Sequence, residues 1–202
     1  YPDVIKIFDM IMGGEFKITQ NSLLFFVPKK SKSTKLTLGE SSSSIRSLLL
    51  LGFYLKHTAQ EDDILIVDEP ELNLHPKNQR LIARLFAKLD NIGIKVFITT
   101  HSDYIIKELN TLIMLNQDLP HIKKIIEKEG YQKDELIDIK DIRVYQAKEG
   151  LIRLSGAKRQ TRGNTLMPAD IDQQTGIGIE SFDDSIDEMN RIQESIFFGE
   201  EN

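Results

Sequence analysis

The chain contains no cysteine and no tryptophan. The lack of cysteine excludes disulfides and thiolate metal sites, which fits a cytoplasmic protein. No apolar run approaches the ~18 residues that cross a bilayer, and no targeting segment is visible, so we expect no membrane association. With 202 residues, of which 40% are hydrophobic, the sequence predicts a soluble globular segment of one or two domains.

A phosphate-cradling loop is also missing. None of the twelve glycines is followed by lysine, so the pattern Gly-x-x-x-x-Gly-Lys-[Ser/Thr] does not occur. A nucleotide site built on these residues would therefore lack a large part of its phosphate contacts.

Among the features that are present, the segment Ile64–Pro76 is the most informative. Four apolar residues lead into Asp68 and Glu69, and a proline follows. A buried strand that carries two adjacent carboxylates to its C-terminal edge can place a magnesium ligand beside a base that activates water. The simpler alternative is a core strand that ends in a solvated acidic turn.

A second apolar strand is predicted over residues 94–100, and it ends at His101. Between the two strands, a helix beginning near Pro76 carries its apolar residues on one face. A right-handed crossover would make the strands parallel neighbours, with Asp68, Glu69 and His101 at one edge of the sheet.

These residues resemble the ABC-type ATPases, and within them the AAA-like ATPases of Septu-type and overcoming-lysogenization-defect anti-phage systems. The motif DEPELNLHP at Asp68–Pro76, followed by TTHS at Thr99–Ser102, carries the resemblance. It implies an α/β fold with a mostly parallel sheet flanked by helices and with β-hairpins at its periphery. It also implies ATP and Mg²⁺ as cofactors, with Asp68 at the metal, Glu69 as the catalytic base and His101 as the switch histidine.

The stretch Gly39–Arg46 resembles the signature motif of the same family, and an apolar helix follows it, whose N-terminus favours a phosphate. The sequence departs from the family pattern because its glycine precedes the serines instead of following them. The simpler alternative is a helix cap formed by Ser43 or Ser44. The resemblance implies nucleotide contacts from the signature, and from Asn73 in the D-loop, by the residues Ser41, Ser42, Ser43, Ser44, Arg46 and Asn73.

In ABC-type ATPases the P-loop lobe precedes the signature, and this chain starts at Tyr1 without an initiator methionine. We expect residues 1–155 to be the C-terminal lobe of an ATPase domain in a longer protein, which forms a homodimer or higher oligomer with composite ATP sites. A degenerate chain that serves as a nucleotide-free scaffold is the alternative.

Turn signals and periodicity predict hairpins over Glu15–Val27 and Ile142–Leu154. Residues 156–202 are expected to form an irregular loop and then an acidic amphipathic helix, which packs on the core or docks a second protein. Septu-like systems pair the ATPase with a nuclease, so the resemblance implies a nuclease partner. The apolar stripe of this helix comprises Phe182, Ile186, Met189, Ile192 and Ile196.

The charge is unevenly distributed along the chain. A net charge of -5 argues against wholesale coating of nucleic acid. Basic clusters at Lys29–Lys35 and Lys158–Arg162 either contact phosphates or are solvated turns, and no aromatic residue interleaves with the lysines of the first. Nucleic-acid binding therefore stays open.

Other classes of function fit less well. A pure interaction module has no need for both Glu69 and His101. A nuclease needs a cluster of carboxylates that holds one or two metal ions, and the sequence has no second acidic strand end to complete such a cluster. The sequence favours an ATPase that regulates or assembles a nuclease in anti-phage defence. A DNA-repair or chromosome-organising ATPase of the same superfamily is the alternative, although no sustained heptad run is present.

Overall fold

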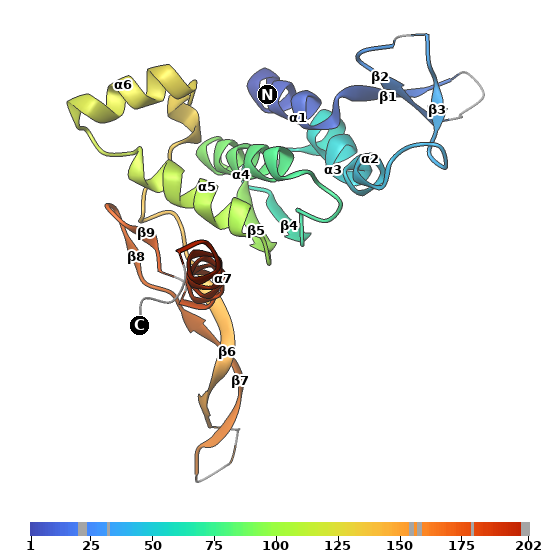
Figure 1. Cartoon of the computed structure of the whole chain (residues 1–202). Helices are drawn as coiled ribbons and strands as arrows, with labels where there is room; N and C mark the ends of the chain where they lie inside the picture. The colour runs from blue at the N-terminus through green and yellow to red at the C-terminus, as the bar shows by residue number, and fades with distance from the viewer. Residues whose placement is uncertain (20–23, 32, 154–155, 157–158, 179, 199–202) are drawn as a thin grey trace. The chain divides into compact units, whose positions relative to one another are not determined.

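The computed structural model describes residues 1–19, 24–31, 33–153, 156, 159–178 and 180–198, with the side chains of residues 180–187 excepted. The chain divides into two compact units, Tyr1–Leu136 and Ile137–Asn202. The fold is mixed α/β, with helices and four small sheets among the described residues (Figure 1).

The first unit opens with helix α1 (Pro2–Met12) and a three-stranded antiparallel sheet of β1 (Gly14–Ile18), β2 (Leu24–Pro28) and β3 (Leu36–Thr37). The predicted hairpin over Glu15–Val27 is confirmed by the antiparallel pairing of β1 with β2, and its turn residues 20–23 lie outside the described residues. Gly14 permits the close approach of these strands, because a Cβ atom there would lie 2.5 Å from the Val27 carbonyl oxygen.

The last serines and the apolar stretch that follows them form three short helical pieces. They are α2 (Ser43–Ser47), α3 (Leu49–Phe53) and a π-helical turn, η1 (Tyr54–Thr58). The sequence predicted one continuous helix here. The structure divides it at Leu48, which ends α2 and begins α3. Gly52 lets this segment pack closely on α1, since a Cβ atom at this position would lie 2.8 Å from the Phe8 ring.

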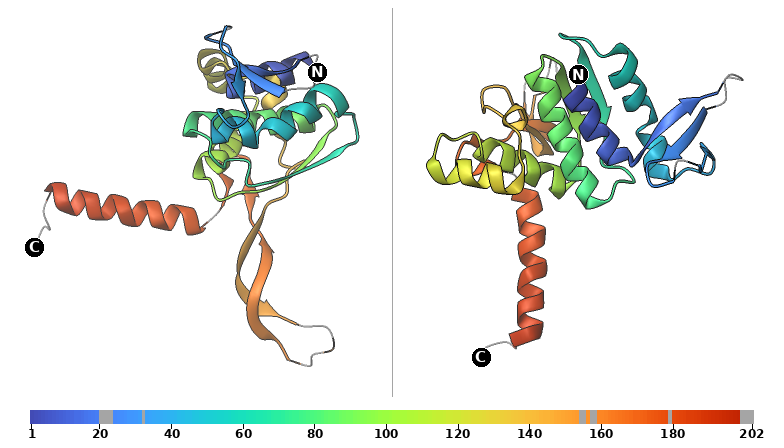
Figure 2. Two further views of the ribbon diagram at one scale, coloured as in Figure 1. Left: turned by 90° about the vertical axis from the view of Figure 1, so that its right-hand side faces the viewer. Right: turned by 90° about the horizontal axis from the view of Figure 1, so that it is seen from above.

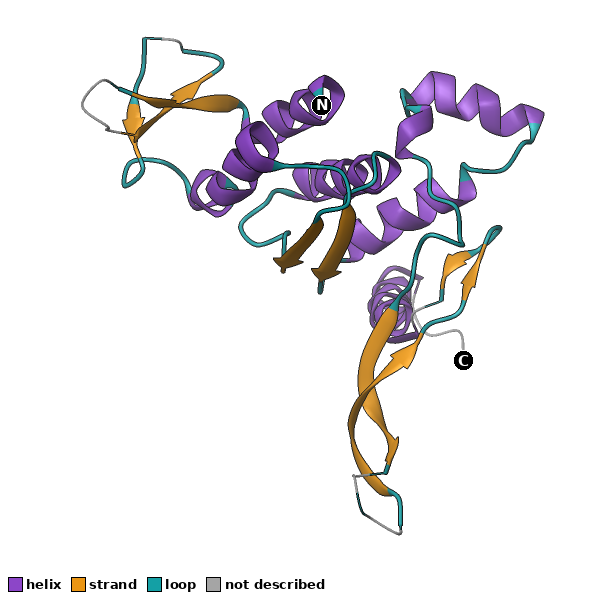
Figure 3. Cartoon of the chain, turned by 180° about the vertical axis from the view of Figure 1, so that it is seen from behind, coloured by secondary structure: helices purple, strands orange, loops and turns teal. Residues whose placement is uncertain are grey.

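The predicted strand-helix-strand unit is present. It consists of β4 (Ile64–Asp68), α4 (Pro76–Asn91) and β5 (Lys95–Thr99), and the two strands pair in parallel from Ile64 opposite Lys95 to Asp68 opposite Thr99. The apolar face of α4 is buried, as its periodicity indicates. Both strands therefore end at the same edge (Figure 3).

Two expectations about this sheet are corrected by the structure. Among the described strands the parallel sheet consists of β4 and β5 alone, and the other three sheets are antiparallel, so a mostly parallel sheet is not what the chain forms. The strands are also not fully buried. Ile64, Ile66 and Phe97 on one face are 67%, 70% and 57% exposed, and the residues of the opposite face are half-buried.

Helices α5 (Asp103–Met114) and α6 (Pro120–Glu129) and the 3-10 turn η2 (Lys133–Glu135) complete the first unit (Figure 2). Three basic residues at successive turns of α4 tie the unit together through ion pairs. Their distances are 2.5 Å from Arg80 Nε to Glu108 Oε2, 2.6 Å from Arg84 Nη2 to Glu135 Oε2, and 2.5 Å from Lys88 Nζ to Asp134 Oδ1. Because Glu108 and Glu135 are buried, the loss of their cationic partners would destabilise the fold.

The second unit contains a two-stranded ribbon, β6 (Tyr145–Ile152) and β7 (Thr161–Pro168), a small pair β8 (Ile171–Asp172) and β9 (Gly176–Ile177), and helix α7 (Glu180–Phe198). The hairpin predicted over Ile142–Leu154 is wrong, because β6 continues from Tyr145 to Ile152 without a turn and pairs with β7. The segment expected to be irregular contains β7, β8 and β9. The predicted C-terminal helix is present as α7. None of the helices in the described part is long and apolar enough to cross a membrane.

Candidate active site

The site is built at the C-terminal edge of β4 and β5. Glu69, directly after β4, has a left-handed backbone with φ 44°, a conformation that costs a residue with a side chain about 1–2 kcal/mol. Its backbone N–H donates to the carbonyl and to the hydroxyl oxygen of Thr99, at 3.1 and 3.2 Å. These bonds from the neighbouring strand hold the turn in its strained form, as is common at functional sites.

Thr99 also orients the first carboxylate. Its hydroxyl donates to Oδ1 of Asp68, and the two residues are directly opposite each other in the parallel pair. Asp68 is exposed, so its remaining oxygen lone pairs face solvent. The residue therefore presents a fixed, hard oxygen ligand at the end of a strand.

Glu69 and His101 meet across the edge. The distance from Glu69 Oε1 to His101 Nε2 is 3.7 Å, and the imidazole is 85% exposed. At this exposure the pair contributes little to stability. Its significance is geometric, because it brings a carboxylate and an imidazole from two adjacent strands to one point.

Glu71 is a residue whose contacts the sequence did not predict. Its Oε1 accepts a hydrogen bond from the Thr100 hydroxyl at 2.8 Å and another from the His101 backbone N–H at 2.7 Å. Glu71 lies within the motif Asp68–Pro76, but neither periodicity nor spacing signals a contact between it and the turn after the next strand. That contact depends on the parallel register of β4 with β5.

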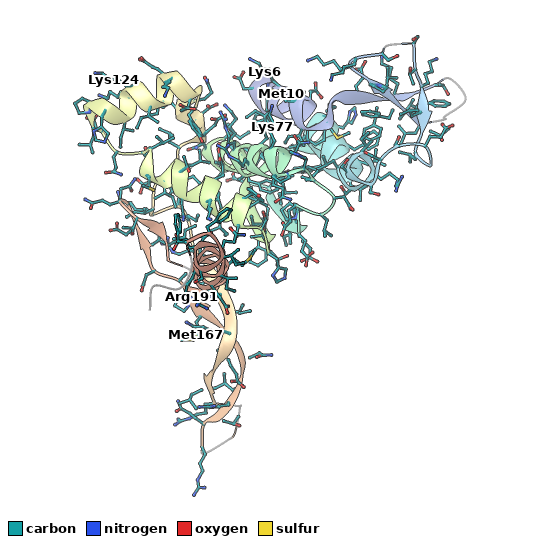
Figure 4. The ribbon with its side chains drawn as sticks, in the orientation of Figure 1. Lys6, Met10, Lys77, Lys124, Met167 and Arg191 are labelled. Carbon is teal, nitrogen blue, oxygen red and sulfur yellow. The ribbon has the colours of Figure 1, made fainter. Side chains whose placement is uncertain are left out.

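The turn that follows the acidic residues leads directly into α4. Asn73 has a positive φ of 63°, which asparagine tolerates, and its side chain is exposed. His75 caps the helix by accepting from the N–H of Lys77, at 3.3 Å, and Lys77 lies in the first turn of α4 (Figure 4). Ser102 caps α5 by accepting from Ile105 N–H at 3.2 Å. Two helices thus begin beside the carboxylates, and their N-termini favour negative charge.

The serine segment forms a separate cluster. Ser42, and not Ser43 or Ser44, is the N-cap of α2; it accepts from Ile45 N–H and lies 2.8 Å from the Ser44 hydroxyl. The buried Ser41 donates to the Thr37 carbonyl.

Arg46 folds back over the same segment. It donates to the Ser41 carbonyl and, at 3.1 Å, to the hydroxyl of Ser43. Among the described residues, no hydrogen bond or ion pair joins this cluster to the acidic edge. The structure therefore brings Asp68, Glu69 and His101 together and leaves the serines and Arg46 as a group of their own.

The donor set fits a magnesium ion held with few protein ligands. The described residues contain no group of three or more His, Cys, Asp or Glu side chains that could hold a metal by themselves. Magnesium keeps several waters and is commonly bound through one or two carboxylates plus substrate phosphates. Asp68 offers such a carboxylate.

Parallel strands that carry adjacent carboxylates and a histidine to one edge, flanked by helix N-termini, are typical of α/β proteins that bind nucleotides. Residues 3–106, slightly more than half of the chain, match the AAA ATPase domain family, and the chain belongs to this family. The matched range includes the serine cluster, the acidic turn and His101. Membership indicates a general ATPase.

Two further comparisons add little. No curated protein shows significant similarity to the chain. A solved structure described as "Structural biochemistry of ATP-driven dimerization and DNA stimulated activation of SMC ATPases" is similar at 12% identity and a TM-score of 0.43, over 93% of this chain and 87% of that one. A likeness at this TM-score has no weight for the function of this chain.

Proposed function

We propose that this chain supplies the carboxylate and histidine part of an ATP-hydrolysing site of the ABC type. The observation that carries the proposal is the meeting of Glu69 with His101 at 3.7 Å, beside Asp68, on two adjacent parallel strand ends. A core strand with a merely solvated acidic turn does not require a strained Glu69 backbone or a threonine that fixes both carboxylate residues.

Each side chain then has one task. Asp68, oriented by Thr99, would hold Mg²⁺ through water, and the ion when bound neutralises charge on the phosphate oxygens. The oxygen of the attacking water bonds to the γ-phosphorus as the bond between that phosphorus and the ADP oxygen breaks. Glu69 accepts the proton that this water releases. His101 donates a hydrogen bond to a γ-phosphate oxygen.

The rest of the phosphate shell is proposed to come from outside residues 1–202, because no phosphate-cradling loop occurs among them. We assign residues 1–155 to the C-terminal lobe of the ATPase domain. Two copies would pair head to tail, so that Ser41, Ser42, Ser43, Ser44 and Arg46 of one subunit close on the ATP of the other, with Asn73 at the same interface. The separation of the serine cluster from the acidic edge supports this composite site.

The proposal is tested by Glu69→Gln in the complete protein. The change removes the base and retains the shape, so hydrolysis should fall by about 10²- to 10⁴-fold while binding of Mg²⁺ and ATP persists. Glu127→Gln, an exposed glutamate of α6, is the matched control and should hydrolyse ATP at the normal rate. Undiminished turnover in the Glu69 variant would refute the assignment.

We further propose a nuclease partner and a role in anti-phage defence for a cytoplasmic protein of this kind. The defence role rests on the motif resemblance at Asp68–Pro76 and Thr99–Ser102. The partner proposal has a structural support in α7, where Met189 and Ile196 are 60% and 75% exposed. Exposed apolar residues at helical spacing are a common way to dock on a second protein. Phe182 and Ile186 of the same stripe lie outside the described side chains.

A second candidate is an ATPase that acts on DNA, and the β6–β7 ribbon favours it. Residues 145–168 carry five basic side chains and one acidic side chain, in a chain whose net charge is -5. Among the described residues, no carboxylate pairs with Lys148, Arg153, Arg159 or Arg162, and all four are exposed. A basic, exposed two-stranded ribbon matches the major groove of B-DNA, which is ~12 Å wide and admits such a ribbon.

The chemistry of the ribbon favours duplex DNA over the other nucleic acids. Tyr145 is its only aromatic residue, so it offers no row of stacking platforms for single strands. The major groove of A-form RNA is too narrow to admit side chains. Binding would therefore depend mainly on phosphate contacts and would weaken steeply with salt.

Fluorescence anisotropy on labelled duplex DNA, duplex RNA and single-stranded DNA tests this candidate. Replacing Arg153, Arg159 and Arg162 with glutamine should weaken duplex binding and lower the salt slope by ~0.9 for each phosphate that the protein no longer neutralises. The same number of changes on α6, at Lys123, Lys124 and Lys128, is the control. Equal losses of affinity in both variants would indicate nonspecific electrostatic attraction and would refute the hypothesis that the ribbon is the DNA-binding site.

A further inference from the structure

Glu71 connects the turn after β4 to the turn after β5. Its Oε1 accepts from the Thr100 hydroxyl at 2.8 Å and from the backbone N–H of His101 at 2.7 Å. Both bonds end on one carboxylate oxygen, and hydrogen bonds to a charged acceptor are stronger than neutral ones. The backbone of His101 is thereby fixed to the turn that carries Glu69.

These bonds belong to a closed circuit. The Thr100 hydroxyl also accepts from Ser102 N–H at 3.0 Å, and the Ser102 hydroxyl bonds to Gln79 Oε1 at 2.5 Å. Gln79 Nε2 donates to the Leu74 carbonyl at 2.9 Å, and Leu74 N–H donates to the Glu71 carbonyl at 2.9 Å. The circuit leaves the His101 turn little freedom to shift against the acidic turn.

The second oxygen of Glu71 has a different environment. Oε2 is buried and has no hydrogen-bond partner among the described residues. An unsatisfied buried oxygen is destabilising. The contribution of Glu71 that the structure shows is therefore made through Oε1, which holds the Thr100 hydroxyl and the His101 backbone N–H.

We propose that Glu71 is a positioning residue, which fixes the backbone of His101 so that the imidazole stays beside Glu69 and reaches the γ-phosphate. The proposal rests on the proposed ATPase function. Glu71 acts through His101 and does not itself contact the reacting atoms. Its removal lowers the rate of hydrolysis without changing the affinity for ATP, because the groups that bind the nucleotide remain in place.

The test uses Glu71→Ala and Glu71→Gln in the complete protein, with two measurements. Amide hydrogen exchange at His101, recorded by NMR without nucleotide, should accelerate at least ~10-fold in Glu71→Ala, because the charged acceptor is gone. The kcat for ATP should fall ~10-fold or more with KM unchanged. In Glu71→Gln, the amide oxygen still accepts both bonds, so exchange and kcat should lie between those of the wild type and of the alanine variant.

Asp172→Ala is the matched control. The Asp172 carboxylate accepts from the N–H of Gln174 and from the N–H and hydroxyl of Thr175, which is the same kind of contact in the second unit. This variant should accelerate exchange only at residues 174–175 and leave kcat unchanged.

The outcomes separate the two proposals. Unchanged His101 exchange in Glu71→Ala overturns the positioning role, and so does faster exchange with normal kcat while Glu69→Gln is inactive. A wild-type protein that hydrolyses no ATP overturns the proposed function and the positioning role together. If Glu71→Ala does not fold, Glu71→Gln decides between the outcomes. A kcat and a His101 exchange rate equal to those of the wild type overturn the positioning role. A reduced kcat at unchanged KM, together with faster exchange at His101, supports it.

Discussion

The acidic turn after β4 (Asp68–Glu71) and the serine turn, formed by the serine cluster Ser41–Arg46, are held by different kinds of contact. Asp68, Glu69 and Glu71 are tied to Thr99, Thr100 and His101, about thirty positions away along the chain. The hydrogen bonds of the serine turn join residues no more than eight positions apart. The difference indicates that the geometry of the acidic turn depends on the pairing of β4 with β5, whereas the serine turn is a local unit that keeps its form independently of that pairing.

The largest effect is expected when two inactive variants, one in each turn, are mixed. Glu69→Gln should inactivate one half of a composite site, and a joint Ser43→Ala and Arg46→Ala change should inactivate the other half. Each variant alone should be nearly inactive, while an equal mixture should recover up to about a quarter of wild-type activity, because about half of the dimers are then mixed and one of the two sites in a mixed dimer is intact. The readout is the ATPase rate against the mixing ratio.

If the mixture stays inactive although the subunits exchange, the serine turn does not act across an interface. Mixing Glu69→Gln with itself is the control and should recover nothing. Mass photometry or size-exclusion chromatography confirms that mixed dimers form.

A smaller effect is expected from α7, which is proposed to face a different protein and not a second copy. Met189→Asp with Ile196→Asp should abolish co-purification of the nuclease partner and leave complementation between the ATPase variants intact, because charges buried in an apolar interface are costly. Replacing the exposed Glu188 and Glu194 of the same helix with glutamine is the control. Loss of the partner at an unchanged melting temperature supports docking, and a large fall in melting temperature supports core packing instead.

The smallest effect concerns the turn that leads into the serines. Hydrogen bonds from the backbone N–H and the hydroxyl of Thr37 hold the pKa of Glu40 below its usual value. A lowered folded pKa contributes stability that is fully present above the unfolded pKa and is lost as pH falls through the folded pKa. Glu40→Gln should therefore remove a small, acid-sensitive part of the stability. Melting curves recorded from neutral to acidic pH on both proteins measure it.

The sequence predicted those parts of the fold that depend on local pattern and strand order. The parallel pairing of β4 with β5 follows from two apolar strands separated by an amphipathic helix, and it places Asp68, Glu69 and His101 at one edge. The β6–β7 register was missed because a glycine at position 150 is a turn signal by itself. In the structure, Gly150 lies opposite Gly163 of β7, and β6 continues through it without interruption.

The candidate site was predictable in its residue types but not in its connections. Adjacent carboxylates at a strand end and a histidine at the next strand end are visible in the letters of the sequence. The bonds from Thr99 to Asp68 and from His101 to Glu71 depend on the register of two strands and on a left-handed turn at Glu69. No local pattern of residues encodes such contacts, since they arise only when both turns are in place.

The exposed apolar face of β4 and β5 makes the protein prone to self-association. Ile64, Ile66 and Phe97 form an exposed apolar surface on two strands that, among the described residues, pair only with each other, and exposed apolar strands of this kind can pair with those of another copy. While the protein folds, a second copy at high concentration therefore competes for this face with the other elements of the same chain.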